Sequence, residues 1–165
     1  MKTVSAGKKH IRKQILDSSA LVRSLASQAD RIEAACDAVV GTLKAGAKIL
    51  TAGNGGSAAE AMHFAEELVG RFRSNRISLP SVALVADGTA LTCIGNDFGF
   101  DRVFSRQIEG LGKPGDMLVL FSTSGNGRNL ALAWKAARAR GMKTLFLLGR
   151  DGGPLAGKAD VEIIV

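Results

Sequence analysis

Short apolar runs alternate with amphipathic stretches along most of the chain. Five runs have the length and composition of buried strands: Lys48–Ala52, Ser81–Ala86, Asp116–Phe121, Lys143–Leu148 and Val161–Val165. Helix-like stretches lie between them: Ser57–Val69, Gly88–Gly95 with Phe104–Leu111, Asn129–Arg140 and a short piece near Pro154–Gly157. Apolar strands joined by helical crossovers indicate a parallel sheet with helices on both faces. The pattern therefore predicts an α/β fold with a parallel sheet of about five strands.

Residues 1–45 are predicted to form a helical arm that precedes the α/β core of residues 46–165. From Lys8 to Lys44 the chain has no proline and a single late glycine. Its apolar residues follow helical spacing and form one stripe: Ile15, Leu21, Val22, Leu25, Ile32, Ala35, Val39 and Leu43. We expect two helices that bend near Ser27 to Asp30. The stripe could pack against another subunit or cover the chain's own sheet, and the pattern favours neither.

The composition is that of one globular domain. The chain has 165 residues, of which 46% are hydrophobic and 22% charged. No apolar run approaches the roughly 20 residues that span a membrane, and the basic start lacks the apolar core of a signal peptide. Cys36 and Cys93 are far apart in the sequence. We expect reduced thiols, no membrane association and a cytoplasmic location.

The net charge of +7 raises the question of nucleic-acid binding. The basic residues are scattered singly and are not interleaved with aromatic residues, so nucleic acid is not an expected partner. A basic surface also attracts small anionic substrates.

The loop that follows the first predicted strand is suited to an anion. Gly53, Asn54, Gly55, Gly56 and Ser57 follow each other directly and lead into a helix. The glycines let the backbone bend close to a ligand, and the helix start offers unpaired N–H groups and a positive dipole end. A phosphate group is the expected ligand.

The helix after this loop carries candidate acid–base and metal-binding groups. Glu60, His63 and Glu67 are spaced so that they share one helix face. His63 and Glu67 suit half a metal site or an acid–base pair, although such residues also occur as solvated surface groups. The second histidine, His10, lies in the remote arm, so the obvious ligands of this chain leave a metal shell incomplete.

A second polar loop follows the third predicted strand. Ser122, Thr123 and Ser124 supply three consecutive hydroxyls, which suit the oxygens of a phosphate monoester but also occur in ordinary turns and helix caps. Two such loops at equivalent strand ends favour a phosphate site. The first loop also fits the dinucleotide pattern GxGxx[G/A], but the acidic residue that closes the second strand, Asp87, lies 29 residues past Ala58 instead of ~20.

A third polar stretch, Gly95–Asp101, is predicted to be a loop between aromatic residues. It is either a turn with a helix cap at Asp101 or a place where Asn96 and Asp97 accept hydrogen bonds from sugar hydroxyls.

Together these motifs resemble one family. The motifs are Gly53–Ser57, Ala61–Leu68, Gly95–Phe100, Ser122–Asn126 and Asp151–Gly153. They occur in the order and spacing of the phosphoheptose isomerases, also called sedoheptulose 7-phosphate isomerases, of the sugar isomerase (SIS) superfamily. The resemblance implies a single flavodoxin-like three-layer α/β/α domain, a homotetramer with active sites between subunits, and bound zinc. The implied reaction converts sedoheptulose 7-phosphate to D-glycero-D-manno-heptose 7-phosphate for heptose biosynthesis and lipopolysaccharide.

The resemblance also implies roles for individual residues. It assigns Asn54, Gly55, Gly56 and Ser57 to substrate binding, Asn96 and Asp97 to sugar hydroxyls, and Ser122, Thr123 and Ser124 to the phosphate. It assigns His63 and Glu67 to zinc, and Glu67 also to substrate binding and to catalysis as the base.

The chain departs from the family pattern at two places. Gly127 stands where the family usually has a serine. Family members also continue past the last strand into a helix with a glutamine and a histidine that complete the zinc shell, whereas this chain stops at Val165. We therefore expect this form to bind zinc poorly and to isomerise slowly or not at all.

An alternative function is a non-enzymatic SIS protein that senses sugar phosphates or associates with a replication initiator. The paired acids Glu66 and Glu67, together with Ser124, favour the enzyme.

Overall fold

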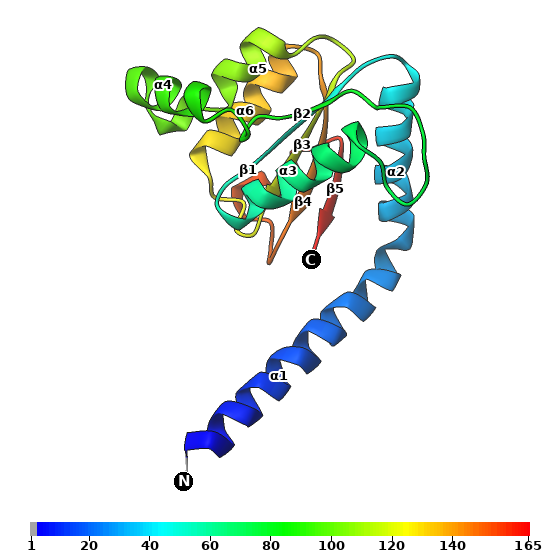
Figure 1. The fold of residues 1–165 in the computed structure, drawn as a ribbon, viewed down its shortest axis with the longest axis vertical. Coiled ribbons are helices and arrows are strands. Elements are labelled where there is room, and N and C mark those ends of the chain that lie inside the picture. The colour runs from blue at the N-terminus through cyan, green and yellow to red at the C-terminus, as the bar shows by residue number, and fades with distance from the viewer. Residues whose placement is uncertain (1–2) are drawn as a thin grey trace.

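A computed structural model describes the backbone of residues 3–165 and the side chains of residues 7–165. At its centre is a five-stranded sheet in the order β2-β1-β3-β4-β5 (Figure 1). Its strands are β1 (Ile49–Gly53), β2 (Ser81–Ala83), β3 (Met117–Ser122), β4 (Lys143–Leu148) and β5 (Val161–Ile164). All four neighbouring pairs are parallel. The predicted parallel sheet is confirmed.

The edge strand β2 is shorter than the sequence predicts. Pairing stops at Ala83 instead of Ala86. The N–H group of Leu84 still donates to the carbonyl oxygen of Thr51 at 2.9 Å, but the N–H group of Ala86 turns back to the carbonyl oxygen of Ala83. This turn takes the chain out of the sheet, although Leu84 itself is buried in the core.

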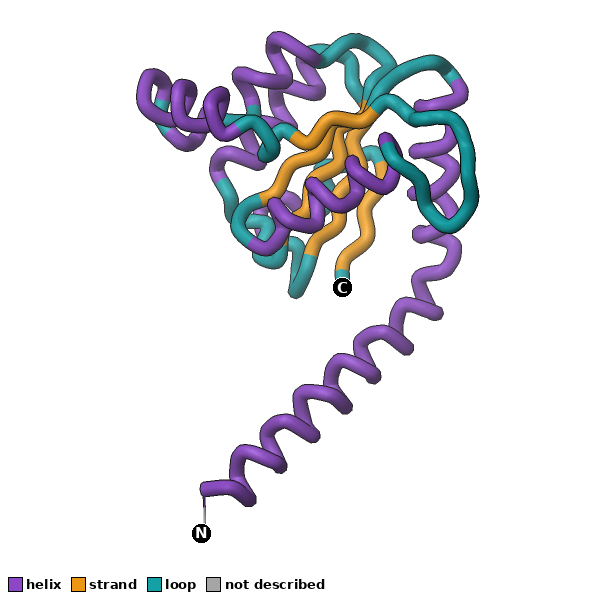
Figure 2. The backbone as a smooth tube through the Cα atoms, viewed as in Figure 1, coloured by secondary structure: helices purple, strands orange, loops and turns teal. Residues whose placement is uncertain are grey.

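Helices cover both faces of the sheet (Figure 2). On one face lie α2 (Ala29–Lys44) and α3 (Gly56–Val69). On the other lie α4 (Gly88–Phe98), α5 (Ser105–Leu111) and α6 (Arg128–Ala139). Short 3-10 turns occur at Leu25–Gln28, Phe100–Arg102 and Gly153–Leu155. The arrangement is the three-layer α/β/α architecture expected from the sequence.

Alternate side chains of each strand point into two separate hydrophobic clusters. In β3, Leu118 and Leu120 pack with Phe146 and Leu130 on the side of α6. Val119 faces the other way and packs with the residues of α2 and α3. Because both faces are buried, β3 has a continuous apolar run from Met117 to Phe121, and β1 is buried along its whole length.

The N-terminal arm bends where the sequence predicts it. Helix α1 (Thr3–Ser24) ends at the 3-10 turn, and α2 follows from Ala29. The amide of Gln28 donates to the carbonyl oxygen of Ile164 at 2.8 Å and thereby attaches the bend to β5. Across residues 3–165, no helix combines the length and the apolar character that crossing a membrane requires.

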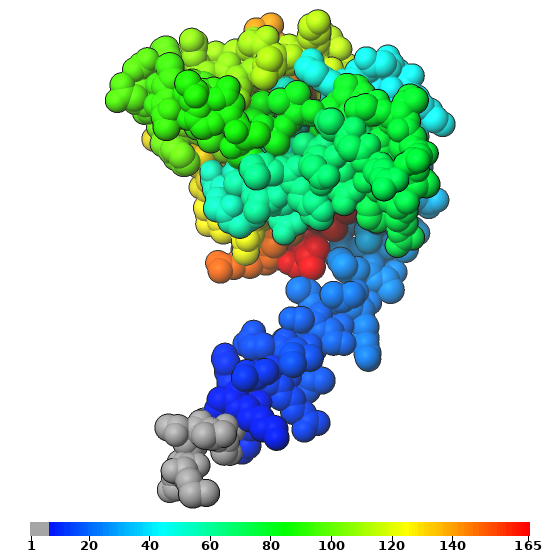
Figure 3. Space-filling model, in the orientation of Figure 1, coloured from blue at the N-terminus to red at the C-terminus, as the bar shows by residue number. Residues whose placement is uncertain are grey.

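The apolar stripe of the arm divides into two parts with different surroundings. Ile32 and Val39 of α2 pack against the sheet, which is the intrachain covering that the sequence allowed. Ile15 and Val22 of α1 remain 64% and 67% exposed. Figure 3 shows α1 extending away from the body of the protein. An exposed apolar helix face of this kind is typical of an interface.

Candidate functional site

The two polar loops lie side by side at the carboxyl end of the sheet. Strands β1 and β3 are neighbours, and Gly53 at the end of β1 pairs in register with Phe121. The loops that follow line a polar cavity of about 180 Å³. Its lining residues are Asn54, Ser57, Phe121, Ser122, Thr123, Ser124 and Gly127. The structure thus brings five of the predicted substrate-binding side chains around one small polar space.

Glycine is required in the first loop for two different reasons. Gly55 has φ 56° and ψ −121°, a conformation that side chains disfavour. A Cβ atom on Gly53 would lie 2.3 Å from the carbonyl oxygen of Ser57, so the loop passes too close for any side chain. These two positions turn the chain sharply from β1 into α3, whose first residue is Gly56.

The second loop holds its hydroxyl groups ready to donate. The backbone N–H of Gly125 donates to the Ser122 hydroxyl oxygen at 3.0 Å, and that of Asn126 donates to the Ser124 hydroxyl oxygen at 3.4 Å. Because these oxygens act as acceptors within the loop, their protons remain available for a ligand oxygen. The side chain of Thr123 is exposed beside them.

Asn129, at the start of α6, joins the two loops. Its side-chain amide exchanges two hydrogen bonds with that of Asn54, at 2.9 and 2.8 Å. Asn129 is 3% exposed, whereas Asn54 is exposed at the cavity. Sequence reasoning gave Asn129 no role beyond a helix start, because 75 residues separate the two asparagines.

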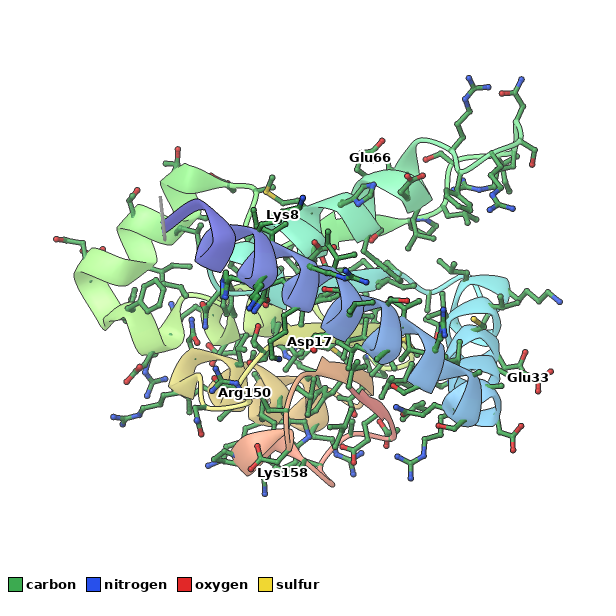
Figure 4. The ribbon with its side chains drawn as sticks, turned by 90° about the horizontal axis from the view of Figure 1, so that it is seen from below. Lys8, Asp17, Glu33, Glu66, Arg150 and Lys158 are labelled. Atoms are coloured by element: carbon green, nitrogen blue, oxygen red, sulfur yellow. The ribbon has the colours of Figure 1, made fainter. Side chains whose placement is uncertain are left out.

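Helix α3 carries a cluster of potential metal ligands. His63 Nε2 and Glu67 Oε1 lie 3.2 Å apart. Among the described side chains, Glu66 joins them, with ligand atoms of all three residues within 4.8 Å of one another. Figure 4 shows Glu66 on α3, well apart from Arg150 after β4. Sequence reasoning used Glu66 only as one of the paired acids that favour the enzyme and did not assign it to the metal site, although its spacing of three residues from His63 is also a same-face spacing.

Hydrogen bonds from two side chains, Thr51 and Arg76, attach α3 to its surroundings. The buried hydroxyl of Thr51 in β1 donates to the carbonyl oxygen of Ala61 at 2.7 Å. Beyond the helix end, the Arg76 guanidinium donates to the carbonyl oxygen of Leu68 at 2.8 Å and to that of Glu67. Arg76 therefore satisfies carbonyl groups that the last turn of a helix leaves free.

The polar cavity lies beside the first turn of α3, whereas His63 and Glu67 lie further along the same helix. Glu60 borders a second cavity of about 250 Å³ that Ser122 and Thr123 also line. Glu67 lies ten residues after Ser57, which corresponds to about 15 Å along a helix axis. The predicted base therefore lies near the end of α3, whereas Ser57, which lines the polar cavity, lies in its first turn.

The stretch containing Asn96 and Asp97 is helical, which corrects the prediction of a loop. Helix α4 continues through Gly95 to Phe98 and ends where Gly99 takes φ 84°. Gly95 is tolerated inside the helix because helix propensity is a weak constraint in a packed protein. Both side chains are exposed, with the Asn96 amide donating to Asp97 at 2.8 Å. They lie on a helix that packs against the opposite face of the sheet from α3.

Asp101 is not the helix cap that one interpretation predicted. It lies in a 3-10 turn, and the N-cap position of α5 is Phe104. The Asp101 carboxylate instead forms an ion pair with Arg128 at 3.1 Å. This pair connects the segment after α4 to the first residue of α6.

Comparison with known proteins assigns a family to this arrangement. Residues 15–149 match the SIS domain family. The chain is 49% identical over 156 residues to a phosphoheptose isomerase of Akkermansia muciniphila, covering 94% of this chain and 82% of that protein.

Solved structures agree with the sequence match. A phosphoheptose isomerase from Francisella tularensis superimposes with a TM-score of 0.79 and 36% identity, covering 82% of this chain and 73% of that one. A phosphoheptose isomerase from Neisseria gonorrhoeae superimposes with a TM-score of 0.72 and 42% identity, covering 88% and 84%.

Proposed function

This chain belongs to the phosphoheptose isomerases of the SIS domain family, and on that premise we propose that it converts sedoheptulose 7-phosphate to D-glycero-D-manno-heptose 7-phosphate. The observation that carries the proposal is the polar cavity between the β1 and β3 loops, with its row of serine and threonine hydroxyls. The product would supply heptose biosynthesis, including lipopolysaccharide, in the cytoplasm. The free thiols of Cys36 and Cys93 are compatible with that compartment.

The cavity is suited to the phosphate end of the substrate. Ser122, Thr123 and Ser124 offer hydroxyl donors, and the start of α3 adds the positive end of its helix dipole. Asn54 and Ser57 complete the polar wall. Holding the phosphate in this way fixes the position of the open-chain sugar, so that its reactive end reaches the base in a defined orientation.

Isomerisation moves one proton between neighbouring carbons. We assign Glu67 as the base that removes a proton from C1 of the ketose, next to the C2 carbonyl. The electrons form the C1–C2 double bond of an enediol, and the C2 oxygen takes up a proton. Return of a proton to C2, with loss of the proton on the C1 oxygen, gives the aldehyde at C1. Atoms and charge balance without an external oxidant.

We further propose that the cluster on α3 holds zinc. A tetrahedral zinc site with bonds of about 2.1 Å places its ligand atoms about 3.4 Å apart, and the 3.2 Å between His63 and Glu67 fits that spacing. Glu66 is close enough to contribute a further oxygen. Zinc bound here would stabilise negative charge on the substrate oxygens. Since Glu66 and Glu67 are adjacent, one carboxylate can hold the ion while Glu67 meets the substrate.

A homotetramer is the assembly that we propose for this chain. The exposed apolar residues of α1, such as Ile15 and Val22, support an interface between copies. The separation of Glu67 from the hydroxyl loop supports an active site to which more than one copy contributes. In that arrangement Asn96 and Asp97, exposed on α4, would be accessible to a sugar held by another copy.

The proposal is tested by assaying turnover of sedoheptulose 7-phosphate by the purified chain and by Glu67→Gln. We expect the variant to lose about 100-fold or more in kcat, as removal of a general base does. Glu33→Gln, which alters an exposed carboxylate on α2, is the matched control and should keep the full rate. Binding of the sugar phosphate without turnover in the wild-type protein would instead favour a non-enzymatic sugar-phosphate sensor.

A further inference from the structure

The orientation of the Asn129 amide is determined by the helix that it begins. Its Oδ1 atom accepts a hydrogen bond from the backbone N–H of Leu130 at 2.9 Å. A backbone N–H can only donate, so the oxygen of this amide must face Leu130 and the NH₂ group must face the other way. Asn129 is 3% exposed and lies in the first turn of α6, where neighbouring groups leave it little freedom.

This fixed amide in turn determines the orientation of Asn54. The Asn129 NH₂ group donates to Asn54 Oδ1 at 2.8 Å, and Asn129 Oδ1 accepts from Asn54 Nδ2 at 2.9 Å. Both hydrogen bonds would be lost if the Asn54 amide rotated by 180°, because donor would then face donor and acceptor would face acceptor. A single arrangement of the two amides therefore satisfies all three hydrogen bonds.

Gly127 leaves the space that the pair occupies. A Cβ atom at this position would lie 3.0 Å from Asn129 Oδ1 and 3.0 Å from Asn54 Nδ2. Its φ of −65° is accessible to any residue, so close approach to the pair, and not backbone strain, is what a side chain would meet here. The glycine that departs from the family pattern thus lies directly against the two asparagines.

We propose that Asn129 is a positioning residue for the phosphate site, acting through Asn54; this inference rests on the proposed function. One Asn54 N–H is used by Asn129, and the second remains to donate to an anionic oxygen in the cavity. Without Asn129 the exposed Asn54 amide rotates freely and presents its oxygen to the anion for part of the time. The pair also connects the β1 loop to the α6 end of the β3 loop, so the two walls of the cavity keep their spacing.

A double-mutant cycle tests this role. The dissociation constant of sedoheptulose 7-phosphate is measured by calorimetry for the wild type, Asn54→Ala, Asn129→Ala and the double variant, with KM and kcat measured alongside. We expect Asn129→Ala to weaken binding about 10-fold, since two hydrogen bonds to the cavity wall are lost. In the Asn54→Ala background the same substitution should change binding less than about 2-fold, because the residue through which it acts is already gone.

Two further variants separate positioning from a loss of folding. Thr144→Val removes a buried hydroxyl on β4 that donates to the Asp160 carboxylate, so it should lower stability while leaving binding unchanged. If Asn129→Ala does not fold, Asn129→Asp keeps the oxygen that accepts from Leu130 and benefits from the helix dipole. The aspartate keeps the acceptor for Asn54 Nδ2 but removes the donor to Asn54 Oδ1. The loss of that donor affects binding only where Asn54 is present, whereas the added charge acts in both backgrounds.

The outcomes are distinct. Equal weakening by Asn129→Ala with and without Asn54 would overturn the positioning role and leave the proposed function standing. If the wild type binds the sugar phosphate and Asn129→Ala binds it equally well, the positioning role is likewise overturned and the proposed function stands. A wild-type protein that binds no sugar phosphate would overturn both proposals.

Discussion

The side-chain hydroxyl of Thr51 donates a hydrogen bond to the carbonyl oxygen of Ala61, at 2.7 Å. Thr51 is fully buried in the middle of β1, and Ala61 lies in α3 two residues before His63. This contact therefore attaches the helix that carries His63, Glu66 and Glu67 directly to the central sheet. It acts together with the packing of Phe64 and Leu68 against the sheet to hold His63 and Glu67 in position.

Thr51→Val is expected to lower the free energy of unfolding by about 0.5–1.5 kcal/mol, as loss of one internal hydrogen bond does. A slight displacement of α3 should also reduce kcat/KM, by up to about 10-fold. Urea unfolding and steady-state assays measure the two effects. The matched control is Thr42→Val, because the Thr42 hydroxyl is equally buried but bonds within its own helix, to Ala38. An equal fall in kcat/KM for both variants would contradict the proposed anchoring.

Gly125→Ala is expected to destabilise the protein by about 3 kcal/mol or more. The residue has φ 62°, and an added Cβ atom would lie 1.8 Å from the carbonyl oxygen of Gly152. In Gly41→Ala the added methyl group meets open space in the interior of α2, so this control should gain about 0.5–1 kcal/mol. Thermal unfolding measures the change in stability of both variants relative to the wild type. A small effect of Gly125→Ala would mean that the hydroxyl loop and the Gly149–Gly153 turn separate easily.

Removal of one ligand should identify the members of the metal cluster. We expect His63→Gln and Glu67→Gln each to weaken zinc binding by at least about 10-fold, because the loss of even an outer partner costs that much. Glu66→Gln should have the same effect only if this residue contributes a ligand. Zinc titration by calorimetry provides the measurement. Glu33→Gln, with an exposed carboxylate on α2, should bind zinc as the wild type does.

The buried end of the sheet opposite the cavity should show a pH dependence of stability. Burial raises the pKa of Asp116, but hydrogen bonds from the Lys48 ammonium and from the backbone N–H groups of Lys48 and Lys113 outweigh it. The net pKa therefore lies below the ordinary value of 3.8. A carboxyl whose pKa is lowered by folding stabilises the protein above its unfolded pKa. That contribution is lost as the pH falls through the folded pKa.

Asp116→Asn should accordingly lower the free energy of unfolding by about 1–3 kcal/mol at neutral pH. The difference from the wild type should shrink as the pH falls from about 5 to about 2. Chemical unfolding at a series of pH values checks both points. Asp17→Asn, which removes an exposed carboxylate on α1, is the control with little expected effect. A difference that stays constant down to the lowest pH would show that the Asp116 charge is not the source of the stability.

The elements that the sequence predicted well are those with strong local signals. Lys143–Leu148 has the same bounds in the prediction and in the structure, because the apolar run Leu145–Leu148 fits a strand buried on both faces. The bend predicted near Ser27 to Asp30 is confirmed by the 3-10 turn at Leu25–Gln28. Periodicity shows which side of a helix is apolar but not what that side contacts. It therefore placed the exposed residues of α1 and the buried ones of α2 in one stripe.

The extent of α4 was not predictable in this way. Gly95, Asn96 and Asp97 are typical turn residues, and they favoured a loop. In the structure, Leu91 and Ile94 of the same helix pack against the core, and this packing carries the helix past the glycine to Phe98. Tertiary contacts outweighed local preference, as they do when the difference in propensity is about 1 kcal/mol.

The sequence alone determined the succession of strands and helices along the chain and the chemistry of the two loops. Both depend on interactions between residues a few positions apart, such as the alternation of apolar side chains and the glycines that end β1. The tertiary structure decided which distant residues meet, as in the pairing of Asn54 with Asn129. It also decided how far Glu67 lies from the hydroxyl loop. Those relations depend on the order of strands in the sheet and on how α3 and α6 pack against it, which no local pattern encodes.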